Sequence, residues 1–196
     1  MSIQFKPLRG SEATPHLEDL ARLRMIVFRE FPYLYEGDLE YEKNYLKTYF
    51  SSPNSFVCLC EIERKIVGAC TAILLADEQN EFQKPFLNKS LDPKTICYFG
   101  ESVLEKEYRG QGIGNQFMSL RLDFAKNLPS VRTAAFCAVV REKNHPQTPR
   151  DYRPLNAFWE KWGFRKDSDL STEFAWKDID QQFETKKQMQ FWSKQL

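Results

Sequence analysis

Three glycines at alternating positions, Gly110, Gly112 and Gly114, stand between a strand-like apolar run and a helix-like amphipathic run. Glycine adopts positive φ angles at little steric cost, and its missing side chain lets a bulky anion approach the backbone. Because a helix follows the turn, its unpaired N–H groups and positive dipole end would face that anion. The segment therefore predicts a strand, a phosphate-binding turn and a helix in succession.

This spacing differs from the two commonest nucleotide-binding motifs. A dinucleotide-binding GxGxxG that begins at Gly110 needs glycine at position 115, which is Asn115. A P-loop needs glycine and lysine at positions 115 and 116, which are Asn115 and Gln116. A plain strand-to-helix turn needs fewer glycines, but it stays open as an alternative, as does a generic nucleotide-binding domain.

Apolar periodicity predicts the order β-α-α-β-β-β-α-β-α-β-β, and hence a single α/β (α+β) domain over residues 1–196. The first strand lies around Ile3 and Phe5, and the first helix has Thr14 as N-cap, Pro15 at its first position and an end near Phe31. The other helices are expected at 38–50, 112–128 and 154–162, and the other strands at 55–61, 66–75, 95–104, 131–140, 172–177 and 187–193. Residues 77–93 are expected to form an ordered flap or a short helix.

Composition excludes several classes of function. The chain has 28 lysines and arginines against 27 aspartates and glutamates. A net charge of +1 does not create the positive electrostatic field that attracts nucleic acid, so nucleic acid is not expected as a partner. The longest uncharged apolar stretch, 66–76, is about half the roughly 20 residues that span a membrane, so no membrane segment is expected. Residues 1–10 lack the apolar core of a secretory signal, and we therefore expect a cytoplasmic protein.

The five cysteines lie in apolar or β-branched runs without a CxxC pair, so we expect reduced, buried thiols. They are Cys58, Cys60, Cys70, Cys97 and Cys137. The two histidines, His16 and His145, are far apart in sequence, and no metal site is expected.

The segment Arg109-x-x-Gly112-x-Gly114 resembles the R/Q-x-x-G-x-G/A signature of the GNAT superfamily of acyl-CoA-dependent N-acyltransferases. The strand before this segment, the helix after it and a later helix that ends in Gly163-Phe164 are also similar to elements of the family. Element order is similar over nearly the whole chain, and residue matches concentrate in 96–164. The resemblance implies a mixed sheet flanked by helices and splayed into a V between the strands at 96–104 and 131–140, with the acyl-CoA in that gap.

The resemblance also implies which residues bind acetyl-CoA. In the family, backbone groups at the end of the fourth strand, here Ser102, Val103 and Leu104, hold the pantetheine arm and the thioester carbonyl. The signature begins at Arg109 and holds the pyrophosphate on backbone amides, here those of Gly110, Gln111, Gly112, Ile113, Gly114 and Asn115. The Leu104 amide would also meet negative charge that develops on the carbonyl oxygen.

The attacking amine must first lose a proton, because an alkylamine has a pKa of about 10.4. We predict Glu101 as the base, acting directly or through water. In members with a fourth-strand glutamate, that position aligns with Tyr98, and strand alternation places residues 98 and 101 on opposite faces unless a bulge intervenes. An exposed or salt-bridged Glu101 is the alternative.

The proton donor to the leaving thiolate is harder to assign. Many family members carry a tyrosine acid where this chain has Trp159, which cannot donate a proton in the same way. Tyr152 aligns with a position where the family often has an asparagine that contacts CoA, and its hydroxyl is predicted to reach the sulfur. A packing role for Tyr152 is the alternative.

The amine site is expected in the loop 29–38, where Arg29, Tyr33 and Tyr35 are the predicted substrate-binding residues. A loop whose aromatic side chains merely cap the core is the alternative. The near-neutral chain favours a small metabolite over a basic peptide. The C-terminal strand, with Phe191 and Trp192, could pair with a second subunit to form a homodimer.

The leading hypothesis is an N-acetyltransferase that moves an acetyl group from acetyl-CoA to a primary amine by direct attack in a ternary complex. The contrasting hypothesis is a noncatalytic acyl-CoA-binding or sensing module, and Trp159 in place of a tyrosine is the feature that favours it.

Overall fold

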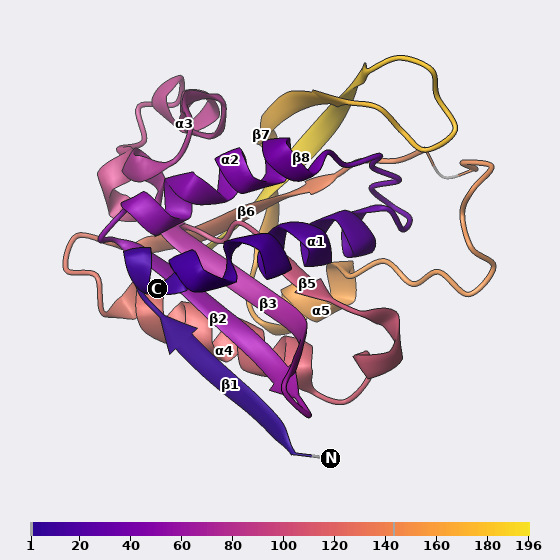
Figure 1. The fold of residues 1–196 in the computed structure, drawn as a ribbon. Helices are drawn as coiled ribbons and strands as arrows, with labels where there is room; N and C mark the ends of the chain where they lie inside the picture. Colours follow the sequence, from indigo (N-terminus) through magenta and orange to yellow (C-terminus); the bar gives the residue numbers. More distant parts are fainter. Residues whose placement is uncertain (1, 143) are drawn as a thin grey trace.

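A mixed β-sheet runs through the molecule in the order β1-β2-β3-β4-β6-β8-β7, with β5 paired to β3 (Figure 1). This computed structural model describes residues 2–142 and 144–196. The strands are β1 (Ile3–Leu8), β2 (Ser55–Ile62), β3 (Lys65–Leu74), β4 (Ile96–Tyr98), β5 (Ser102–Leu104), β6 (Thr133–Val139), β7 (Arg165–Trp176) and β8 (Thr185–Gln195). The pairing of β4 with β6 is parallel, and the other strand pairs are antiparallel.

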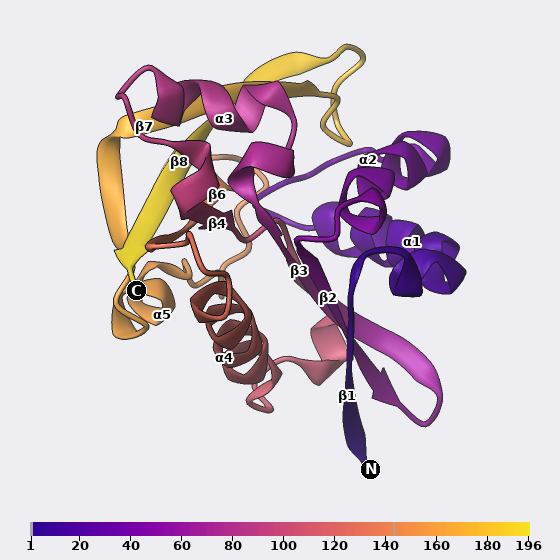
Figure 2. The ribbon, with the colours of Figure 1, turned by 90° about the vertical axis from the view of Figure 1, so that its left-hand side faces the viewer.

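Helices cover both faces of the sheet. Figure 2 shows α1 (Leu17–Phe28) and α2 (Leu39–Ser51) on one side, and α4 (Ile113–Lys126) with α5 (Asn156–Lys161) on the other. Helix α3 (Asn80–Leu87) packs its Phe82 against Phe174 of β7, with ring centroids 4.6 Å apart. The short 3-10 helices are η1 (Gly10–His16), η2 (Leu75–Asp77), η3 (Pro93–Thr95) and η4 (Lys106–Tyr108).

The sheet separates two apolar cores, which is why its central strands read as nearly continuous apolar runs. Leu20 and Leu46 bring α1 and α2 onto the first core, while Phe117 and Leu122 bring α4 onto the second. The predicted single α/β domain with a splayed sheet is confirmed. The five cysteines are buried and free, as expected. Each helix in the described residues is too short or too polar to cross a bilayer.

The first helix differs from the prediction at both ends. Residues 10–16, including Thr14 and Pro15, form the 3-10 helix η1, and α1 begins at Leu17 with His16 as its N-cap. The helix ends at Phe28, earlier than predicted, because Pro32 has no N–H to donate to the Phe28 carbonyl, which accepts instead from the Tyr35 N–H at 2.8 Å.

The C-terminal strands are longer than predicted, and they contradict pairing of the C-terminal strand with a second subunit. β8 lies between β6 and β7 and is hydrogen-bonded on both sides. Its Phe191 and Trp192 are 0% and 4% exposed, so they belong to the core. The edges of the sheet are β1 and β7.

The predicted strand at 95–104 is divided into β4 and β5 by a break at residues 99–101. Gly100 lies in this break, and no larger residue fits there, because a Cβ would lie 2.1 Å from the Tyr49 hydroxyl. On the other side, Arg121 of α4 is buried and points its Nη1 at the Glu101 carbonyl oxygen, 3.4 Å away. The break interrupts strand alternation as a β-bulge would. The side chains of Tyr98 and Glu101 therefore both face α1 and α2.

Candidate functional site

The sheet opens directly after β4. The Phe99 N–H donates to the Ala135 carbonyl of β6 at 2.8 Å, and beyond this bond residues 102–104 pair with β3. Strands β5 and β6 therefore diverge, and the gap between them begins at the Gly100 break.

Backbone groups of β5 alternate between β3 and the gap. The Glu101 carbonyl accepts from Thr71 N–H at 3.0 Å, and Glu105 N–H donates to the Val67 carbonyl at 2.9 Å. Because hydrogen bonds in an antiparallel pair alternate, Val103 also turns its N–H and C=O toward β3, and its side chain is buried in the core. Ser102 and Leu104 turn their backbone N–H and C=O groups toward the gap. The geometry therefore suits Ser102 and Leu104 as backbone contacts for the pantetheine arm, but not Val103, the third predicted residue.

The glycine turn leads from β5 through η4 into α4. Gly110 and Gly112 have φ angles of 79° and 84°, which glycine tolerates and other residues rarely adopt. A Cβ at either position would meet no atom within 4 Å, so open space lies in front of both. In the described part of the chain, the N–H groups of residues 110–114, which include Gln111 and Ile113, have no hydrogen-bond acceptor. These donors at a helix N-terminus suit a diphosphate group.

Asn115, the last residue of the predicted cradle, has structural partners. The Asn115 N–H donates to the Gly112 carbonyl at 3.0 Å, and its Oδ1 accepts from Trp162 Nε1 at 3.2 Å, which ties α4 to α5. Gly114 lies inside α4, where an added Cβ would sit 3.9 Å from Phe158 Cζ. This distance is an ordinary van der Waals contact, so a small residue other than glycine would also fit there.

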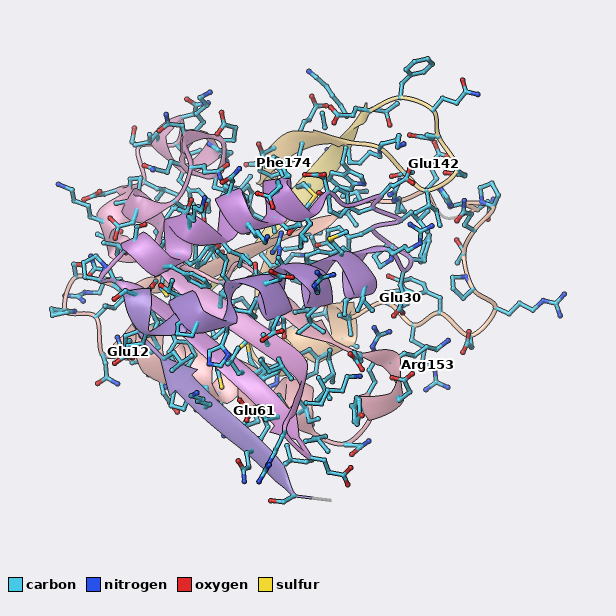
Figure 3. The ribbon with its side chains drawn as sticks, viewed as in Figure 1. Glu12, Glu30, Glu61, Glu142, Arg153 and Phe174 are labelled. Atoms are coloured by element: carbon cyan, nitrogen blue, oxygen red, sulfur yellow. The ribbon has the colours of Figure 1, made fainter. Side chains whose placement is uncertain are left out.

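Arg109 points away from the glycine turn. Its Nε and Nη2 donate to the Leu104 carbonyl at 3.0 and 2.9 Å, and its two Nη atoms pair with Glu30. Glu30 follows α1, at the right-hand end of that helix in Figure 3. The side chain therefore closes the end of β5 against the loop after α1.

Glu101 is 3% exposed and forms a buried ion pair. Its Oε2 lies 2.5 Å from Arg24 Nη1, and Arg24 Nε bonds Glu42. Burial raises the pKa of Glu101, with Arg24 opposing that effect. Its other oxygen, Oε1, is buried with no partner in the described residues. The alternative of a salt-bridged Glu101 is therefore observed, and one carboxylate oxygen still has its hydrogen-bonding capacity unused.

Tyr152 lies in the loop between β6 and α5 and contacts the loop 29–38. Its ring packs edge-on against Phe31 with centroids 4.6 Å apart, and burial raises its pKa. Trp159 lies elsewhere, half-buried in α5 and packed against the second core, with its ring 5.0 Å from Phe136 and 5.1 Å from Trp192.

The loop 29–38 turns its tyrosines inward. Tyr33 packs against Phe28 at 4.6 Å between ring centroids, and burial raises its pKa. Tyr35 forms a β-bridge with Asp178, and burial followed by the charge of Glu42 raises its pKa. Arg29 differs, because its side chain is exposed at the C-cap of α1.

A largely buried arginine side chain holds this loop in place. Arg141 Nε donates to the Pro32 carbonyl at 2.6 Å, while its Nη atoms form a bidentate pair with Asp178 at 2.7 and 3.0 Å. Since Lys187 lies 3.3 Å from the same aspartate, the loop, the end of β6 and the β7–β8 hairpin are joined at one point.

Sequence reasoning missed Arg24, Glu42 and Glu78, which are 8%, 0% and 4% exposed. A signal was present for the first two. Arg24 interrupts the apolar stripe of α1, and Glu42 lies within that of α2. A charge inside an apolar helix face must find a buried partner.

Several solved structures share this fold over the whole chain. Arabidopsis thaliana NAA60, solved with a bisubstrate analogue and with acetyl-CoA, is 14% identical, with a TM-score of 0.62 and coverage of 100% of this chain and 99% of that one. A GNAT-family acetyltransferase from Streptococcus pneumoniae is 16% identical, with a TM-score of 0.62 and full coverage of both chains. The loading GNATL domain of CurA from Lyngbya majuscula is 17% identical, with a TM-score of 0.62 and coverage of 100% and 98%.

No curated protein matches the sequence significantly. The family described as Acetyltransferase (GNAT) family matches residues 19–164, which is well over half of the chain and includes the glycine turn, the gap and Glu101. The chain therefore belongs to the GNAT family of acetyltransferases, whose shared activity is acyl transfer.

Proposed function

We propose that this protein transfers an acetyl group from acetyl-CoA to a primary amine of a small metabolite, by direct attack in a ternary complex. The open space in front of Gly110 and Gly112, next to backbone donors without acceptors, is the observation that carries the proposal. It lies at the end of β5, whose Ser102 and Leu104 face the gap. A carrier with a diphosphate and an extended arm fits both features.

Different residues would bind the diphosphate and the extended arm of acetyl-CoA. The amides of residues 110–114 would hold the diphosphate, and the Ser102 backbone with the Leu104 N–H would hold the arm at the edge of β5, since Arg109 occupies the Leu104 carbonyl. When bound, acetyl-CoA supplies a thioester, in which the acyl carbon accepts the nucleophile and the thiolate leaves. The Leu104 N–H would stabilise the charge that develops on the carbonyl oxygen.

Proton transfer would rest on Glu101 and Tyr152. Glu101 Oε1 would take the proton of the amine, directly or through a water molecule, as the N–C bond forms. Because burial raises its pKa, this carboxylate is a stronger base than an exposed one. The Tyr152 hydroxyl would give a proton to the thiolate as the C–S bond breaks.

The loop 29–38 supports a small acceptor. Tyr33 and Tyr35 line its inner side, and Arg141 holds its backbone against β6 and the β7–β8 hairpin. A net charge of +1 provides no strongly acidic groove for a basic peptide.

A noncatalytic acyl-CoA-binding module is the second candidate. Trp159 is packed between Phe136 and Trp192 and brings no hydroxyl group to the site. This candidate predicts binding of acetyl-CoA without amine-dependent turnover.

Thiol release from acetyl-CoA tests the proposal, with a panel of small primary amines and a basic peptide as acceptors. We expect release with at least one small amine, and at least about tenfold weaker acetyl-CoA binding in Gly112→Val. Gly114→Ala is the matched control, because its Cβ fits. Binding without release across the panel would favour the module, and absence of binding would overturn both candidates.

A further inference from the structure

Arg24 of α1 bridges two buried carboxylates that belong to different elements. Its Nη1 lies 2.5 Å from Glu101 Oε2 at the break after β4, and its Nε bonds Glu42 Oε2 of α2. All three residues are buried. One guanidinium balances only one of the two carboxylates, so the cluster keeps one net negative charge when both are ionised. An excess charge inside a core costs stability, which points to a functional use.

Two aromatic rings fix the guanidinium of Arg24 independently of Glu101. Its Cζ lies 4.3 Å from the centroid of the Tyr45 ring of α2 and 5.0 Å from that of the Phe28 ring of α1. A guanidinium is planar, and its donors point in fixed directions. The Nε bond to Glu42 and the two rings therefore determine where Nη1 points.

Glu101 is held at its backbone and at one carboxylate oxygen. Its N–H donates to Thr71 Oγ1 at 3.1 Å, and its carbonyl accepts from the Thr71 N–H at 3.0 Å. Arg24 holds Oε2, whereas Oε1 is buried with no partner in the described residues. Because Oε2 is occupied, Oε1 is the oxygen left to accept a proton.

We propose that Arg24 is a positioning residue that aims Oε1 of Glu101 at the acceptor amine, and that Glu42 is the counter-charge that keeps Arg24 from weakening this base. The inference rests on the proposed acetyl transfer. In this step the N–H bond of the amine breaks and an O–H bond forms at Oε1, so the cluster passes from one net negative charge to none. Arg24 and Glu42 keep their charges throughout, and no electron transfer is involved.

The charges around Glu101 give Glu42 this role. Burial raises the pKa of Glu101, while Arg24 acts to lower it and Glu42 acts to raise it. Arg24 alone would make the carboxylate a weaker base, and the second carboxylate offsets part of that effect. Further titratable and charged groups face Glu101 from the other elements packed against it. They are Tyr45 and Tyr49 of α2, Cys70 of β3, Glu78 after η2 and Arg121 of α4.

Two conservative variants separate orientation from charge. Arg24→Lys keeps the positive charge, but an ammonium group cannot reproduce the fixed directions of Nε and Nη1. We expect kcat for thiol release to fall at least about tenfold, with the acidic limb of its pH profile unchanged. Glu42→Gln keeps an acceptor for Arg24 Nε and removes one negative charge. Here the acidic limb should move to lower pH by about one pH unit, because Arg24 then acts on Glu101 alone.

Exposed residues on the same two helices supply matched controls. Arg22→Lys changes an arginine of α1 that pairs with Glu18 at 2.6 Å, and Glu40→Gln changes a glutamate of α2 that pairs with Lys43 at 3.0 Å. Both controls should keep kcat and its pH profile. Acetyl-CoA affinity should be unchanged in all four variants, because none of the substituted residues lies at the glycine turn.

A carboxyl titration tests the same charges without turnover. In protein with ¹³C-labelled glutamate, Glu101→Gln identifies the Glu101 signal, which should titrate at lower pH in Glu42→Gln than in the unmodified protein. The double variant Arg24→Met with Glu42→Gln removes one charge of each sign, so the net buried charge is kept. Its Glu101 signal should titrate at higher pH than in the unmodified protein, because only burial then acts strongly on the carboxylate.

Three outcomes would overturn the inference and leave acetyl transfer intact. The first is thiol release with the unmodified rate and profile in both Arg24→Lys and Glu42→Gln. The second is an equal loss of kcat and acetyl-CoA affinity in Arg24→Lys, which indicates a merely structural role. The third is a Glu101 signal that ignores both Glu42→Gln and the double variant. Absence of thiol release from the unmodified protein would instead overturn the proposed function, and this inference with it.

Discussion

The guanidinium of Arg109 and the carboxylate of Glu30 form a bidentate ion pair, with Nη1–Oε2 and Nη2–Oε1 distances of 2.8 and 3.0 Å. The same guanidinium donates to the Leu104 carbonyl, so one side chain joins the end of β5 to the loop that follows α1. The arginine of the family signature here links the expected acceptor loop to the strand that borders the gap.

Glu30→Gln should lower the free energy of unfolding by no more than about 1 kcal/mol. Both side chains are more than a third exposed, 42% for Arg109 and 36% for Glu30, and solvent screens such pairs. Urea unfolding at low salt and at 1 M salt checks this, because salt should shrink the difference between the two proteins. A loss above about 2 kcal/mol that persists in salt would contradict it.

Gly112→Ala and Gly114→Ala should have opposite effects on stability. At Gly112 the φ of 84° strains any residue with a Cβ, at a cost of about 1 to 2 kcal/mol. Gly114 is helical and has room for a Cβ, so alanine there should stabilise by about 0.5 to 1 kcal/mol. Urea unfolding of both variants measures the difference in the free energy of unfolding. Equal effects would show that the turn at Gly112 adopts another backbone conformation that tolerates a Cβ.

Gly100→Ala should destabilise the protein by about 2 to 3 kcal/mol or more, because the new Cβ meets the Tyr49 hydroxyl at 2.1 Å and Thr71 Oγ1 at 2.6 Å. Combining it with Tyr49→Phe should recover part of the loss by removing the nearest atom. Recovery stays partial since Tyr49 Cζ would still lie 2.7 Å from the Cβ. Unfolding free energies of the two single variants and the double variant test the coupling, and strict additivity would contradict it.

Local patterns predicted the strands, most of the helices and the glycine turn because each depends on residues close in sequence. The turn at Gly112 is an example, since the positive φ and the helix N-terminus both follow from adjacent residues. The break at Gly100 could not be predicted in this way. It depends on Tyr49 of α2 and Arg121 of α4, which reach the strand from opposite faces.

The site was predictable in part for the same reason. Glu101 was found from its strand, but its ion pair with Arg24 crosses 77 residues of sequence. Tyr152 could be aligned with a family position, whereas its contact with Phe31 joins two loops that only the folded chain brings together. Glu78 gave no sequence signal, because its burial results from the packing of α2 against the sheet.

Asp178→Asn should lower stability mainly at neutral pH. Burial acts to raise the pKa of Asp178, but Arg141 and Lys187 outweigh it and hold the pKa below its usual range. The carboxylate therefore contributes stability above the unfolded pKa of about 3.9, and the contribution is lost as pH falls through the lower folded value. We expect a loss of about 3 kcal/mol at pH 7, since the buried Lys187 and the largely buried Arg141 lose their partner, and a smaller one near pH 3. A difference that is independent of pH in urea unfolding would contradict this.

Glu78→Gln should have the opposite pH dependence. Burial raises the pKa of Glu78 from 4.5 to about 7, so between these values the folded protein holds a proton that the unfolded chain has released. The stability of the unmodified protein should therefore fall as pH rises through this window, by about 3 kcal/mol from this group. Glutamine is neutral throughout, so the stability of Glu78→Gln relative to the unmodified protein should increase by that amount from pH 4 to pH 8. Urea unfolding across this range measures the change. Glu81→Gln, a change at an exposed glutamate in the first turn of α3, is the control and should run parallel to the unmodified protein. Parallel curves for Glu78→Gln as well would show that the buried carboxyl group ionises with its ordinary pKa.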